Sequence, residues 1–238
     1  MDAPLSPTEP LNQAQLAQWS QKHAFILLLG AGSALIEGTG LLMIIMTTAS
    51  FLGLLHIMRS GKKKKGLGYA NTLSYLRAAG SLALIASPHL ESHVLIGGVL
   101  VLLLLDGLDG WIARRFGESS PEGALLDQEA DALLMLCLCL LLSKHDPLGA
   151  WIMAPGLFRP LFVLTDRDEA TPVASHGFGT RFTRAVGTLS PLILTLLLLP
   201  DFPEHLVMPA AISTTIMLAG SFLYSVHLRL RGQRKIAP

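Results

Sequence analysis

Charged residues are scarce in this sequence. Only 15% of its 238 residues are Asp, Glu, Lys or Arg, and 51% are hydrophobic, whereas a soluble domain carries roughly 25% charged residues. The deficit comes from long apolar runs, which place the chain among integral membrane proteins. The formal net charge is +1, and the basic residues form local clusters and no basic domain. No nucleic-acid partner is therefore expected.

Cysteine is also nearly missing. Cys137 and Cys139 lie two positions apart in an apolar run, so on a helix they point to different faces. They indicate neither a zinc site nor a disulfide framework, and we interpret them as packing residues. A cleavable signal peptide is not indicated, because the first 22 residues are polar.

Long apolar segments fill most of the chain after residue 66. A spanning helix needs about 20 apolar residues, and six segments approach that length: Tyr69–Ser87, His93–Leu108, Ala124–Leu142, Leu148–Leu164, Ala185–Leu199 and Leu206–His227. The sequence therefore predicts an all-α integral membrane protein, with a six-helix transmembrane core in a domain covering residues 66–232.

The part before this core is expected to add membrane-embedded structure. Residues 1–23 form a polar N-terminal segment, and residues 24–60 form an extra hydrophobic helix or hairpin. The apolar stretch Ala24–Met58 is too long for one straight span of about 30 Å. Glycines on both sides of Glu37 favour a break there, although one long tilted helix remains an alternative.

Basic residues indicate the orientation of the core. Lys and Arg gather before the first core segment, at Lys62–Lys65 for example, and again after the second, fourth and sixth segments. The alternate loops contain a single Lys or Arg residue, Lys144. Because basic loops stay in the cytoplasm, both ends of the core are predicted to face the cytoplasm, and the Lys62–Lys65 run is also suited to anionic lipid headgroups.

Two pairs of aspartates flank a turn signal between the second and third core segments. Asp106 and Asp109 are three positions apart, and Asp127 and Asp131 are four apart, so each pair shares one helix face. The stretch between them contains Gly117, two serines and Pro121, which predicts a turn. The two helices are therefore expected to run antiparallel with the four carboxylates facing one another.

Four carboxylates that meet at a membrane boundary need neutralisation. Hard divalent cations with oxygen ligands supply it, and two such ions are suited to clamp a pyrophosphate. Small residues beside the acids allow a nucleotide to approach the backbone, and the fork of Arg114 suits phosphate.

This pattern resembles the signature of the CDP-alcohol phosphatidyltransferase family, D-x2-D-G-x2-A-R-x8-G-x3-D-x3-D. It is filled by Asp106, Asp109, Gly110, Ala113, Arg114, Gly123, Asp127 and Asp131. A second resemblance lies in the stretch from Asn71 to Arg77, which is similar to the N-x-L-[TS]-x2-R start of the family's first core helix. The resemblance covers about residues 66–230, and the first 60 residues are extra relative to the minimal family plan.

The resemblance implies a transfer reaction and its participants. A phosphatidyl-type group would pass from a CDP-linked donor, CDP-diacylglycerol or a similar CDP-alcohol, to a small hydroxyl acceptor with release of CMP, in phospholipid biosynthesis. It also implies membrane lipid as a partner, a homodimer, and a bacterial inner membrane with the active site facing the cytoplasm.

The resemblance further implies roles for particular residues. Two Mg²⁺ or Mn²⁺ ions would be held by Asp106, Asp109 and Asp127 with Asp131 beside them, and Asp131 would be the general base on the acceptor hydroxyl. The implied nucleotide-binding residues are Asn71, Gly110, Ala113, Arg114 and Gly123.

Other residues leave alternatives open. Arg159, in the middle of an apolar segment, is interpreted either as the partner of a carboxylate in the bundle or as a phosphate or acceptor ligand. Many family members have G-K-x-x-T at the start of the fifth core segment, and here Thr180 stands in place of the lysine. Arg181, the next residue, is a candidate to take over that role and bind phosphate. Glu129 points away from the face of Asp127 and Asp131, so it is expected to face solvent or another helix.

The acceptor is left open, and so is a second class of function. The final pair lacks the Asp-Pro-x2-Asp-Lys sequence of many glycerol 3-phosphate transferases, so that subtype is not indicated. A membrane transporter or scaffold that keeps an ion site without transfer chemistry is the alternative, because acids within the membrane also mark ion pathways.

Overall fold

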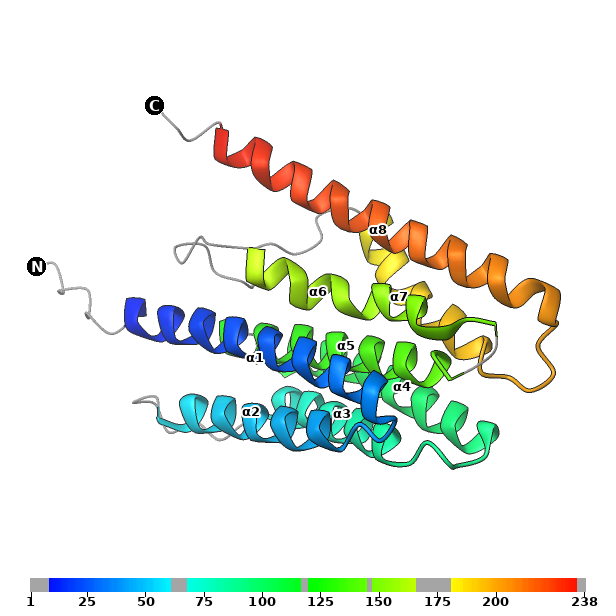
Figure 1. Cartoon of the computed structure of the whole chain (residues 1–238). Helices are drawn as coiled ribbons and strands as arrows, with labels where there is room; N and C mark the ends of the chain where they lie inside the picture. The colour runs from blue at the N-terminus through cyan, green and yellow to red at the C-terminus, as the bar shows by residue number, and fades with distance from the viewer. Residues whose placement is uncertain (1–8, 61–67, 117–119, 145–146, 166–180, 235–238) are drawn as a thin grey trace, which may run out of the picture.

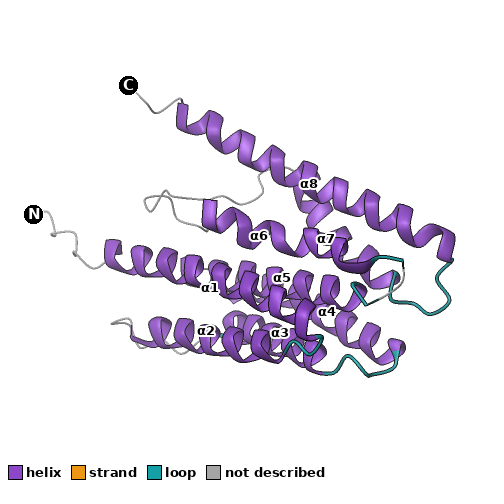
Figure 2. Ribbon diagram, viewed as in Figure 1, coloured by secondary structure: helices purple, strands orange, loops and turns teal. Residues whose placement is uncertain are grey.

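The structure is a computed structural model that describes residues 9–60, 68–116, 120–144, 147–165 and 181–234. Most of these residues are helical and none lies in a strand (Figure 2), as the sequence predicts. The helices are α1 (Glu9–Glu37), α2 (Leu41–Ser60), α3 (Tyr69–Ala86), α4 (Ser92–Phe116), α5 (Pro121–Leu142), the 3-10 helix η1 (Gly149–Met153), α6 (Ala154–Thr165), α7 (Arg181–Leu196) and α8 (Glu204–Arg234).

Successive α-helices run in alternating directions along one bundle (Figure 1). The start of α5 therefore lies at the same end as the start of α3 and the end of α4. The basic run Lys62–Lys65 and the first core residues 66–67 fall outside the described residues.

Residues 9–60 form a helical hairpin. Helix α1 ends at Glu37, and α2 starts at Leu41 after a turn in which Gly38 and Gly40 have φ angles of 73° and 65°. Glycine adopts such angles more readily than residues with a Cβ, which explains why the glycines interrupt this long apolar stretch. Of the two alternatives left open by the sequence, the hairpin is the one observed. Helix α1 also begins at Glu9, so the polar residues before Ala24 and the apolar residues after it belong to one helix.

Helix α5 lies in the centre of the bundle (Figure 1). Nearly every residue from Ala132 to Leu142 is buried. Helix α6 packs very closely against α5 at Gly156, where an added Cβ would lie 2.9 Å from the Leu136 Cα. This close packing bears on the candidate site, because α5 carries two of the four predicted metal ligands.

The outward faces of several helices are apolar. Leu52 on α2, Leu104 on α4 and Ile216 on α8 are all exposed. Among the described residues, two helices are long and apolar enough to cross a membrane by length and composition, at Leu41–Arg59 and Glu204–Tyr224. Three shorter apolar helices are Ser92–Leu108, Gly149–Thr165 and Ala185–Leu196. Apolar side chains on an outer surface suit contact with lipid, and the arrangement as a six-span core remains a prediction.

Candidate active site

The start of α5 is fixed by local sequence. Ser120 is the N-cap residue, and its side chain accepts a hydrogen bond of 3.0 Å from the Gly123 backbone N–H. Pro121 occupies the first helical position, where its missing N–H costs nothing. The helix therefore begins at the predicted turn, and Asp127 and Asp131 follow in its second and third turns.

Three of the four predicted ligands come together. Asp106 lies in the second half of α4, and Asp127 and Asp131 lie in the first half of α5. Carboxylate oxygens from these three residues lie within 4.8 Å of one another. Asp109 is in the same helix as Asp106, but its side chain falls outside the described residues. We call Asp106, Asp127 and Asp131 the aspartate cluster.

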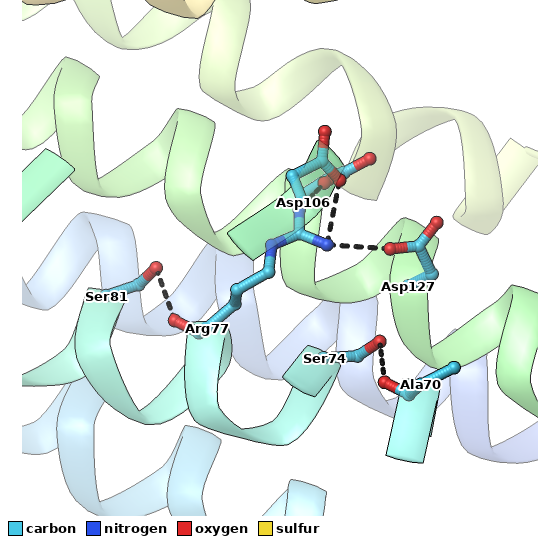
Figure 3. Close-up of polar contacts among 7 residues, drawn as sticks. Ala70, Ser74, Arg77, Ser81, Asp106 and Asp127 are labelled. Carbon is cyan, nitrogen blue, oxygen red and sulfur yellow. Dashed lines mark hydrogen bonds and ion pairs between the residues drawn. The ribbon is translucent and has the colours of Figure 1, made fainter. Parts of the chain in front are cut away.

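Arg77 of α3 reaches into the aspartate cluster (Figure 3). Its Nη1 donates to Asp127 Oδ1 at 2.7 Å and lies 2.8 Å from Asp106 Oδ1. Its Nη2 contacts Asp131 Oδ1. The Arg77 side chain is completely buried, whereas about half of the Asp131 side chain is exposed. One guanidinium therefore joins three helices while the carboxylates stay accessible from one side.

Arg77 is a site residue to which sequence analysis assigned no role. It ends the stretch that begins at Asn71, six positions earlier, and that spacing was the available signal. The missing information was spatial, because only the packing of α3 against α5 brings the guanidinium to Asp127 and Asp131. One turn further along α3, Ser81 Oγ donates to the Arg77 backbone carbonyl at 2.9 Å (Figure 3).

The aspartate cluster fits a divalent cation. Its donors are all carboxylate oxygens, which Mg²⁺ and Mn²⁺ prefer, and they are near enough to share an ion. The contacts of Arg77 show that this point already attracts positive charge. One guanidinium neutralises only one of three carboxylates, so charge remains for a cation to compensate.

Asn71 and Gly123 lie side by side. A Cβ built on Gly123 would be 2.5 Å from Asn71 Oδ1 and 3.2 Å from Ser120 Oγ. The structure thus brings together two of the predicted nucleotide-binding residues, one from α3 and one from α5. Gly110, Ala113 and Arg114 all lie in the last two turns of α4, but their surroundings fall outside what the structure describes.

The structure describes the side chain of only one of the two arginines predicted to bind phosphate. Arg159 of α6 donates from Nη2 to Glu129 Oε1 at 2.8 Å, so it is paired with a carboxylate of the bundle, which was one of the two interpretations. The phosphate role of Arg159 stays a prediction. Arg181 is the first residue of α7, and its side chain falls outside the described residues.

Comparison with known proteins gives matches to one family. The family model for CDP-alcohol phosphatidyltransferases matches residues 67–222. A CDP-diacylglycerol–glycerol-3-phosphate 3-phosphatidyltransferase of Cereibacter sphaeroides is 26% identical over 45% of this chain and 50% of its own length.

Two further relatives match over shorter segments. A CDP-diacylglycerol–inositol 3-phosphatidyltransferase of Arabidopsis thaliana is 35% identical over 30% of this chain and 26% of its own. A probable cardiolipin synthase (CMP-forming) of Drosophila melanogaster is 44% identical over 26% of this chain and 19% of its own. The chain thus covers half or less of the length of each of these relatives. No solved structure matches it.

Proposed function

The chain belongs to the CDP-alcohol phosphatidyltransferase family, and we propose that it transfers a phosphatidyl-type group from CDP-diacylglycerol to a hydroxyl acceptor, releasing CMP. The observation that carries this proposal is the meeting of three carboxylates from α4 and α5 around one buried arginine. Such a cluster suits a metal-assisted displacement at a diphosphate, in which positioning and electrostatics supply most of the catalysis.

The names of the relatives support CDP-diacylglycerol as the donor and do not decide the acceptor. Two of them are named for CDP-diacylglycerol as donor, and their acceptors are glycerol 3-phosphate and inositol. The third is named as forming CMP. We therefore propose a small hydroxyl compound as the acceptor, and the reaction as a step of phospholipid biosynthesis.

The proposed reaction is a displacement at phosphorus. The acceptor oxygen forms a bond to the phosphorus that carries the lipid alcohol, and the bond from this phosphorus to the oxygen of CMP breaks. Asp131 receives the acceptor proton, a role supported by its exposure, which is the largest in the aspartate cluster. CMP leaves with the electrons of the broken bond.

The other site residues are proposed to bind the metal ions and to orient the carboxylates. Asp106, Asp109, Asp127 and Asp131 would hold two Mg²⁺ or Mn²⁺ ions, which when bound supply charge compensation for the diphosphate. Arg77 holds three of these carboxylates in place.

The nucleotide is proposed to lie beside the ends of α3, α4 and α5. Gly123 leaves room for it next to Asn71, and Gly110, Ala113 and Arg114 complete the pocket. Arg181 is proposed to serve the phosphate of the donor or acceptor, whereas Arg159 pairs with Glu129 inside the bundle.

The cellular setting is part of the same proposal. The apolar outer faces and the two candidate spans support a location in the membrane. We propose the bacterial inner membrane, with the aspartate cluster at the cytoplasmic side where a CDP headgroup and a soluble acceptor both have access. A homodimer is proposed from the family resemblance.

The proposed function is tested by measuring CMP release from CDP-diacylglycerol by the purified full chain. Glycerol 3-phosphate, inositol and serine are supplied one at a time, with Mg²⁺, with Mn²⁺ or with EDTA. We expect CMP release only when a divalent ion and one acceptor are both present. Release without an acceptor would indicate a phosphatase-type hydrolysis, and an absence of release under every condition would contradict transfer.

Gly123→Ala tests the nucleotide pocket. The added methyl group would meet Asn71 Oδ1 at 2.5 Å, so Asn71 has to move away from its position beside the start of α5. We expect the KM for the CDP-linked donor to rise roughly tenfold, or about 1.4 kcal/mol, in steady-state assays. Gly97→Ala on α4 is the matched control, because a Cβ there meets nothing within 4 Å. An unchanged KM for Gly123→Ala would contradict this placement of the nucleotide.

A further inference from the structure

Glu129 is a buried carboxylate on the back of the helix that carries Asp127 and Asp131. It lies two positions from each of them, and two positions on an α-helix differ by roughly 200°. Its side chain is only 1% exposed. The carboxylate therefore points into the bundle, on the side of α5 opposite the aspartate cluster.

Glu129 joins three helices through one oxygen. Its Oε1 accepts a hydrogen bond of 3.0 Å from Ser20 Oγ on α1 and one of 2.8 Å from Arg159 Nη2 on α6. A buried charge is tolerated when it is paired and hydrogen-bonded, and both conditions are met here. Loss of either hydrogen bond would remove one of the contacts that hold this side of α5 against α1 and α6.

Ser20 lies in a part of the N-terminal hairpin where side chains of α1 make hydrogen bonds to α2. On one side of it, Trp19 Nε1 donates to the Ser50 carbonyl at 2.9 Å. On the other, His23 Nδ1 lies 2.8 Å from Ser50 Oγ, and the His23 ring stacks on Trp19. The contact from Ser20 to Glu129 therefore links α5 to the whole α1–α2 hairpin. This hairpin lies outside residues 67–222, which the family model matches.

We propose that Ser20, Glu129 and Arg159 form a positioning network through which the N-terminal hairpin sets the rotation of α5 about its axis. The proposal rests on the proposed function, because it concerns the geometry of the same aspartate cluster. A rotation of about 10° would move a carboxylate oxygen on the far side of α5 by on the order of 1 Å. A working site tolerates displacements of about 0.5 Å, so the network controls how well Asp127 and Asp131 meet Asp106.

The affinity for Mn²⁺ distinguishes a positioning role from a purely structural one. It is measured by electron paramagnetic resonance on the purified full chain without substrate, together with the melting temperature. We expect Ser20→Ala to weaken Mn²⁺ binding about three- to tenfold. Ser33→Ala is the matched control, because the Ser33 hydroxyl donates to the Gly30 carbonyl of its own helix. The Mn²⁺ affinity of this variant should stay within about twofold of the parent.

A double-variant cycle tests whether the effect passes through Glu129. Glu129→Gln should weaken Mn²⁺ binding more than Ser20→Ala does, and adding Ser20→Ala to it should have little further effect. If Glu129→Gln does not fold, the charge-balanced pair Glu129→Gln with Arg159→Gln takes its place with the same expectation.

The outcomes separate the network from the active site itself. Parent-like Mn²⁺ affinity in Ser20→Ala and in the Glu129 variant, with or without a lower melting temperature, would overturn the positioning role, as would fully additive effects. Failure of the parent to bind Mn²⁺ would instead contradict the proposed metal site, and with it the inference built on that site.

Discussion

Asp131→Asn is expected to reduce transfer by at least about 1,000-fold while the protein remains folded in detergent. The amide has almost the shape of the carboxylate, but it accepts no proton from the acceptor and supplies no negative charge to a cation. Arg77 keeps its contacts to Asp106 and Asp127, so the packing of α3 on α5 should survive. The measurement is CMP release with the acceptor that the parent uses.

Asp201→Asn is the matched control for this experiment. Asp201 is exposed in the loop between α7 and α8, so its substitution should leave the rate within about twofold of the parent. Activity of Asp131→Asn at more than about a tenth of the parent rate would contradict the role of Asp131 as the base in the reaction.

Arg77→Met is expected to produce two linked effects. Transfer should fall on the order of 100-fold, because the carboxylates lose the group that orients them. The protein should also become unstable in EDTA, because three carboxylates then repel one another without a guanidinium. Added Mg²⁺ should raise the melting temperature of this variant more than it raises that of the parent, since a more negative cluster binds the ion more tightly.

Arg159→Met is the comparison for Arg77→Met. It also removes an arginine from an ion pair, but the partner is Glu129 on the opposite side of α5. Its loss of stability should therefore not be reversed by Mg²⁺. An equal response of the parent, Arg77→Met and Arg159→Met to Mg²⁺ would show that Arg77 and a divalent ion do not share the aspartate cluster.

The sequence predicted those features that follow from helix periodicity and glycine placement. Asp127 and Asp131 share a face because they are four positions apart, and α5 starts at the end of the bundle where α4 finishes and runs in the opposite direction. Asp106 therefore meets them, as expected. The break near Glu37 was likewise predicted from the glycines around it, because φ angles like that of Gly38 favour glycine.

Features that depend on which helix faces which could not be predicted. The sequence shows that Glu129 points away from Asp131, but not that α1 and α6 bring Ser20 and Arg159 to meet it. The same holds for Arg77, whose partners come from two helices far along the chain. The polar residues before Ala24 were expected to form a separate segment, yet buried Leu16 and Trp19 make them part of α1.

The most direct test of the site is a crystal structure of the purified protein with Mn²⁺ and CDP-diacylglycerol, recorded with anomalous scattering at the manganese edge. We expect manganese within about 2.5 Å of carboxylate oxygens of Asp106, Asp127 and Asp131, with the donor diphosphate against the metal and the nucleotide beside Asn71 and Gly123. Manganese bound elsewhere, or a donor whose diphosphate lies away from these aspartates, would contradict the account.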